Sequence, residues 1–152
     1  MNISEQALSV TAAAWAPSMA ADDYGAFLNT LLEAERAGAK LLSAYLDELT
    51  PGSSMWNAIR EVQLDESRNC SVLIHLLLEA QVMPSTAVGD FYVRGLALQA
   101  WRERLQFLNR GQAWVAQRLA AALPRVPQSA QPALQAMLDS HVANIGSCEA
   151  LL

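Results

Sequence analysis

Apolar residues recur along this chain at the three- and four-residue spacing that places side chains on one face of an α-helix. Four long stretches carry this pattern, and no segment shows the alternation typical of a β-strand. We predict that Asp22 or Asp23 caps a helix running to about Leu49 and that a second helix runs from Ser53 or Ser54 to about Gln81. A third begins between Asp90 and Leu96 and ends near Leu123, and Ser129 caps a fourth that runs almost to Leu152. Helices of roughly 20–30 residues with short connections predict an all-α four-helix bundle.

Proline, glycine and serine residues mark the breaks between these stretches. Residues 50–53 read Thr-Pro-Gly-Ser, Pro84 and Gly89 lie in the second connection, and Pro124 and Pro127 end the third stretch. These are strong breaking signals, whereas Pro132 is tolerated in the first turn of the last helix. Residues 1–21 are predicted to form an N-terminal arm, in which Asn2 or Ser4 caps a short turn that Pro17 ends, and residues 22–152 form the bundle domain.

Polar residues interrupt each apolar stripe near its middle. The interruptions are Glu35 in the first helix, Glu66 and Asn69 in the second, Gln112 in the third, and His141 and Asn144 in the fourth. The third stripe is less regular, and Asn109 also interrupts it if the stripe passes through Asn109 and not Leu108. A buried carboxylate is costly unless another group pairs with it. We therefore expect these side chains to meet one another, a metal ion, or an arginine such as Arg36, Arg68 or Arg110.

Other charged residues fall off the stripes and are predicted to face solvent. These residues are Glu33, Glu61 and Asp65, and His75 is expected at the surface or its edge. Gly38 and Gly111 lie inside predicted helices, where glycine costs about 1 kcal/mol relative to alanine, so we expect each to allow close helix approach.

Composition narrows the class of protein. Apolar residues make up 53% of the 152 residues and charged residues only 16%, which favours a bundle partly covered in a homo-oligomer. The net charge of −5 argues against nucleic-acid binding. We find no apolar run of the length that spans a membrane and no basic stretch of a secretory signal. Cys70 and Cys148 show no metal-type spacing, so we expect cytoplasmic residence with free thiols.

The polar residues also follow a spacing shared by two halves of the chain. Glu35 precedes the segment Glu66-Ser67-Arg68-Asn69, and Asn109 precedes Leu138-Asp139-Ser140-His141 by a similar interval. This layout resembles the ferritin-like, rubrerythrin-type di-iron carboxylate proteins, in which two helices give one glutamate each and two give Glu-x-x-His. Glu35, Glu66 and His141 match ligand positions of that family, while Asn69, Asn109 and Leu138 replace ligands.

The resemblance implies a ferritin-like bundle with a long crossover between the second and third helices. A simple up-down-up-down bundle is the alternative if residues 91–95 are helical. The resemblance also implies a structural or binding module with a degenerate metal site. This site would hold either no cofactor or a single Fe or Mn ion, with Zn also possible, bound by Glu35, Glu66 and His141. The alternative is a metal-dependent oxidoreductase built on the same three residues. No catalytic residue and no small-molecule ligand can be named from the sequence.

Overall fold

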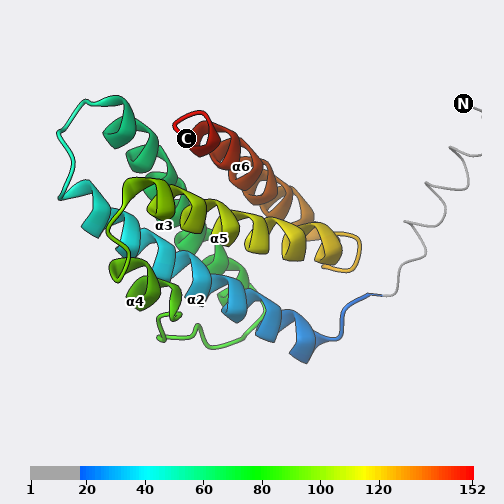
Figure 1. Cartoon of the computed structure of the whole chain (residues 1–152). Helices are drawn as coiled ribbons and strands as arrows, with labels where there is room; N and C mark the ends of the chain where they lie inside the picture. Colours follow the sequence, from blue (N-terminus) through cyan, green and yellow to red (C-terminus); the bar gives the residue numbers. More distant parts are fainter. Residues whose placement is uncertain (1–17) are drawn as a thin grey trace, which may run out of the picture.

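The computed structural model describes residues 18–152, and within them it contains helices and no strand (Figure 1). The elements are α2 (Ala21–Leu46), α3 (Ser54–Glu79), α4 (Phe91–Leu96), α5 (Trp101–Ala122), a 3-10 helix (Gln128–Ala130) and α6 (Gln131–Glu149). The turn predicted around Asn2, Ser4 and Pro17 lies outside the described residues. No helix between residues 18 and 152 is long and apolar enough to cross a membrane.

The helix starts agree with the sequence in part. Ser53 caps α3, because its hydroxyl accepts a hydrogen bond from the backbone N–H of Trp56 at 3.2 Å. Helix α2 instead begins after Ala20, so the capping role predicted for Asp22 or Asp23 is wrong, and both acids lie in the first turn. Ser129 likewise does not cap α6, since it lies within the 3-10 helix that precedes it.

The predicted third helix is two helices, which corrects its start from residues 90–96 to Trp101. The hydroxyl of Tyr45 on α2 donates to the backbone carbonyl of Gly95 at 2.7 Å. That carbonyl also accepts from the backbone N–H of Leu98 at 3.2 Å, so a side chain and a short turn together satisfy it where α4 ends. Gly95 is buried, and a Cβ atom on it would lie 2.7 Å from Leu41 Cδ1, so only a glycine lets α4 approach α2 this closely.

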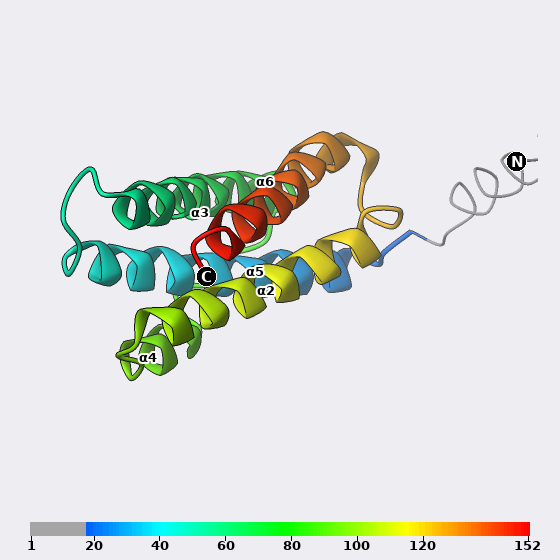
Figure 2. The ribbon, with the colours of Figure 1, turned by 45° about the horizontal axis from the view of Figure 1, so that its top comes forward.

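The four long helices pack as two connected pairs, α2 with α3 and α5 with α6 (Figures 1 and 2). The connection from α3 to α5 lies along α2, and it contains α4. Its contacts follow α2 in order: Asn29 donates to the carbonyl of Met83, Arg36 to the carbonyl of Ala87, and Tyr45 to the carbonyl of Gly95. The chain therefore leaves α3 near the start of α2 and enters α5 near its end.

The apolar core is divided into two clusters. One includes Leu28, Leu32, Leu73, Leu119 and Leu134, near the start of α2, and the other includes Leu42, Tyr45, Ile59, Leu105 and Cys148, near its end. In all four long helices, the polar residues that interrupt the stripe lie between the positions that belong to the two clusters. The interruptions therefore meet at one level inside the bundle.

Candidate functional site

The structure brings Glu35, Glu66 and His141 together in this polar layer. Their exposed fractions are 1%, 5% and 1%, so all three are withdrawn from solvent. Asn69, Gln112 and Asn144 are buried at the same level. Each of the four long helices thus contributes at least one member, as the stripes predict.

A continuous chain of hydrogen bonds joins five of these side chains across the four helices. The Nδ2 group of Asn69 donates to Glu35 Oε2 at 3.4 Å, and Glu35 Oε1 lies 2.5 Å from His141 Nε2. His141 Nδ1 bonds to Gln112 Oε1, and Gln112 Nε2 donates to Glu66 Oε1 at 2.6 Å. These five side chains therefore bond to one another, and one oxygen of Glu66 is left without a partner.

The direction of these bonds follows from Gln112. Its Nε2 group donates to Glu66, so its Oε1 faces His141 and can only accept. His141 Nδ1 must then carry a hydrogen. One proton lies between His141 Nε2 and Glu35 Oε1. On the imidazole it gives an ion pair, and on the carboxyl group it gives a neutral pair. In both cases the second ring nitrogen of His141 is hydrogen-bonded.

Only one carboxyl oxygen of Glu66 is hydrogen-bonded, but the carboxyl group is closely packed. Its Oε1 accepts from Gln112, while its Oε2 is buried without a hydrogen-bond partner. The carboxyl group lies against Gly38 of α2, where a Cβ atom would be 2.7 Å from Glu66 Cδ. Gly38 therefore makes room for a carboxyl group, which refines the predicted role of close helix approach.

Burial raises the pKa of Glu66 well above 4.5, because desolvation penalises its charged form. The nearby carboxylates of Glu35 and, more weakly, Asp65 raise this pKa further, while the hydrogen bond from Gln112 lowers it. Glu66 is thus a protonated acid at pH values where an exposed glutamate is ionised. A neutral Glu66 also limits the buried charge to the Glu35–His141 pair.

This raised pKa predicts a pH-dependent stability. The unfolded chain releases the Glu66 proton near pH 4.5 and the folded protein releases it only at higher pH, so the free energy of unfolding falls as pH rises between these values. Glu66→Gln does not titrate, so we expect its stability relative to wild type to increase from about pH 5 to about pH 8. Urea unfolding at both pH values measures this difference. Glu61→Gln, an exposed acid on α3, serves as the control, and an equal difference at both pH values for Glu66→Gln contradicts the prediction.

The donor atoms of the layer do not fit a metal ion in this arrangement. Both ring nitrogens of His141 and both carboxyl oxygens of Glu35 are engaged by neighbouring side chains. Among residues 18–152, no three histidine, cysteine, aspartate or glutamate side chains are grouped as a metal site. The metal-binding role of Glu35, Glu66 and His141 stays a prediction, and the geometry favours a direct Glu35–His141 hydrogen bond with Glu66 joined to His141 through Gln112.

Two acids predicted to face solvent are half-buried instead. Glu33 accepts from the hydroxyl of Ser85 at 2.7 Å, and Asp65 accepts from Asn144 Nδ2 at 3.1 Å. The prediction that both acids face solvent is wrong because their hydrogen-bond partners come from distant segments of the chain. Glu61 and His75 are exposed, as predicted.

Gln112 is the functional residue whose role the sequence did not show. It lies on the third stripe, yet neutral amides carry no metal-ligand or catalytic signal. The arginines considered as partners for the buried acids bind elsewhere, since Arg68 pairs with Asp65 and Arg36 bonds to a backbone carbonyl. The sequence signal that remained was the mid-stripe position of Gln112, level with the other polar residues.

A pocket of about 470 Å³ opens between α2, α4 and α5 and reaches the polar layer. Its walls carry the aromatic side chains of Phe91, Phe107 and Trp114. Glu35 and Glu66 line the pocket at its buried end, while Arg94 and Arg110 line its exposed end. The polar layer is therefore adjacent to a space of the size that small molecules occupy.

The two cysteines lie outside this hydrogen-bond chain. Burial raises the pKa of both Cys70 and Cys148 to about 11, so both remain thiols rather than reactive thiolates.

Comparison with known proteins gives a family for the chain. No curated protein and no solved structure matches it. One family model matches residues 22–150, which cover α2 through α6 and therefore every member of the polar layer. The chain belongs to the family described as domain of unknown function (DUF6306).

Proposed function

We propose that this domain is a ferritin-like four-helix bundle in which a hydrogen-bonded polar layer replaces the metal centre, and that it acts as a binding module. The path of the α3–α5 connection supports the ferritin-like topology. It runs along α2 from Asn29 to Tyr45 and thereby returns the chain to the end at which α3 began. A connection of this kind makes α3 and α5 parallel. Residues 91–95 are helical, which is the condition for the simple bundle, but they form the separate helix α4 within the connection and not the start of α5.

The observation that carries the replacement of the metal centre is the engagement of both ring nitrogens of His141. A histidine ligand needs one free nitrogen lone pair for the metal ion. Here Glu35 occupies one nitrogen and Gln112 the other. Gln112 also lies between His141 and Glu66, so a single ion cannot reach both side chains without breaking two hydrogen bonds.

Metal analysis tests this proposal. We expect protein purified aerobically from medium supplemented with Fe and Mn to contain far less than one metal ion per chain, on the order of background. Inductively coupled plasma mass spectrometry of wild type, Glu35→Gln and the surface variant Glu79→Gln makes the measurement. Stoichiometric metal that is retained by Glu79→Gln and lost in Glu35→Gln would contradict the proposal and favour the metal-dependent oxidoreductase.

A further inference from the structure

The pocket between α2, α4 and α5 has a chemical gradient from its buried end to its mouth. Glu66 lies at the buried end with an exposed fraction of 5%, whereas Trp114, near the mouth, is 37% exposed. Between these two residues the walls are largely apolar. Such an apolar space with few polar groups at fixed places is the usual form of a small-molecule site.

We propose that this pocket binds a small neutral aromatic molecule that carries a hydroxyl group, with its ring among Phe91, Phe107 and Trp114 and its hydroxyl against the carboxyl group of Glu66. The inference deepens the proposed function, on which it rests, because a metal ion held by Glu66 would occupy the same carboxyl group. It names the class of ligand and the residues that would recognise it.

The aromatic walls carry the ring preference. Phe91 and Phe107 stack with centroids 4.2 Å apart, and Gly111 lets Phe91 rest on α5, since a Cβ atom there would be 2.6 Å from Phe91 Cε2. These two rings form one wall of the pocket, and Trp114, from the same helix as Phe107, lines it nearer to solvent. A flat aromatic molecule gains most from such a surface, through burial and ring contacts.

The unpartnered oxygen of Glu66 carries the hydroxyl preference. Oε1 of Glu66 accepts from Gln112, and Oε2 is buried without a partner. A buried polar atom left unsatisfied destabilises the folded protein, and a ligand that pairs with it recovers part of that loss. A hydroxyl group both donates and accepts, so it pairs with the carboxyl group in either protonation state.

The charges that line the pocket favour a neutral molecule. The two arginines that line the pocket, Arg94 and Arg110, are equal in number to the lining acids Glu33 and Asp90, and Glu35 is paired with His141. Both guanidinium groups also lie over the ring of Phe107, at 5.5 and 5.9 Å from its centroid. These four lining charges therefore sum to zero, so they do not favour an ionic ligand of either sign.

Titration of the full chain with 2-naphthol tests the proposal by ¹H–¹⁵N NMR. We expect saturable shifts of the Gly89 and Gly111 amides, which line the pocket, and none of Gly52 and Gly146, which do not. 2-Methylnaphthalene has nearly the same shape without the hydroxyl, and we expect it to bind roughly tenfold more weakly, the value of one buried hydrogen bond. Trp114→Ala should weaken binding severalfold, while the matched variant Trp56→Ala, on α3 outside the pocket, should not.

Glu66→Leu separates recognition of the hydroxyl from binding of the ring. We expect this variant to bind 2-naphthol and 2-methylnaphthalene with equal affinity. If it does not fold, the wild-type ratio of the two affinities and the Trp114→Ala result still decide the question. Equal affinities for wild type, or no saturable shift at Gly89 and Gly111, would overturn the proposal. Metal content measured on the same sample distinguishes the two failures. Metal-free protein that does not bind 2-naphthol would refute only the proposed pocket ligand, whereas stoichiometric metal would refute the proposed function.

Discussion

Replacing His141 with leucine is expected to lower the free energy of unfolding by about 3–5 kcal/mol, the cost of leaving one member of a buried pair without its partner. Leucine fills a similar volume, so the loss is mainly electrostatic. Glu35 then keeps only the 3.4 Å bond from Asn69, and Gln112 Oε1 loses its donor. Chemical denaturation at neutral pH, read by circular dichroism, measures the change.

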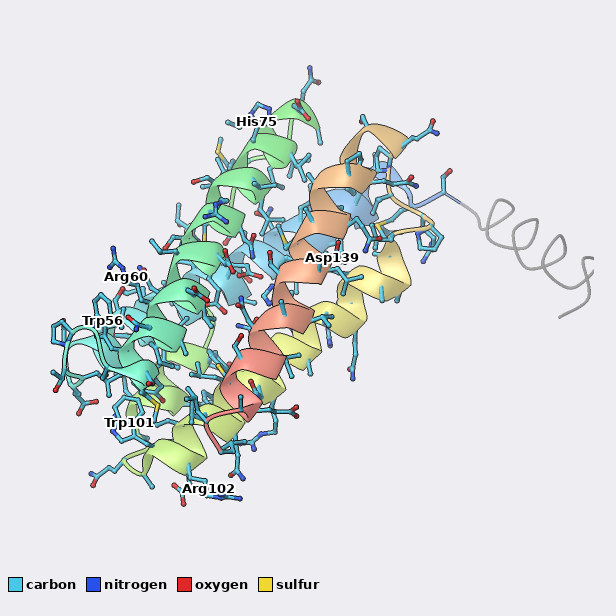
Figure 3. The ribbon with its side chains drawn as sticks, turned by 90° about the horizontal axis from the view of Figure 1, so that it is seen from above. Trp56, Arg60, His75, Trp101, Arg102 and Asp139 are labelled. Carbon is cyan, nitrogen blue, oxygen red and sulfur yellow. The ribbon has the colours of Figure 1, made fainter. Side chains whose placement is uncertain are left out.

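The double variant Glu35→Leu/His141→Leu shows whether pairing is the cause. Removing both members of a buried pair is often far less costly than removing one, so we expect the double variant to be more stable than His141→Leu alone. His75→Leu is the control, because His75 lies exposed near the end of α3 (Figure 3). Its weak surface pair with Glu79 predicts a change within about 0.5 kcal/mol. A double variant that is destabilised by the sum of the single changes would show that His141 and Glu35 act independently.

The stripe pattern identified the polar layer because burial on a helix has a fixed period. Glu35, Glu66, Asn69 and His141 all lie inside the bundle where their stripes placed them. The same period predicts two apolar clusters, because the apolar stripe of each long helix continues on the same face on both sides of its polar residues. Local sequence was therefore enough to predict which residues are buried together.

Partners within the layer depend on distances between helices, which the period does not contain. Gln112 connects His141 to Glu66 only because its side chain reaches from α5, which packs on α6, across the interior of the bundle to α3. The same limit explains the break after α4, where the decisive bond joins Tyr45 to Gly95, 50 residues later. Neither residue carries a local breaking signal strong enough to place that end.

Helix α2 itself offers a test of how closely Glu66 is packed. In a helix interior, glycine is less stable than alanine by about 0.5–1 kcal/mol, so Gly38→Ala would be stabilising if Gly38 only covered the core. A Cβ atom at this position would instead lie 2.7 Å from Glu66 Cδ and 2.9 Å from Glu66 Oε1. Gln112 holds that carboxyl group by a 2.6 Å hydrogen bond, so it cannot move without losing the bond.

We therefore expect Gly38→Ala to lower the free energy of unfolding by about 1–3 kcal/mol, as overpacking of a filled core does. In a Glu66→Ala background the obstruction is absent, and the same substitution should raise stability by about 0.5–1 kcal/mol. Gly146→Ala on α6 is the matched control, because nothing lies within 4 Å of its added Cβ atom, and it should be stabilising in both backgrounds. A sign reversal at Gly38 alone would show that this glycine is required by the Glu66 carboxyl group, whereas the same sign in both backgrounds would place its role in backbone packing.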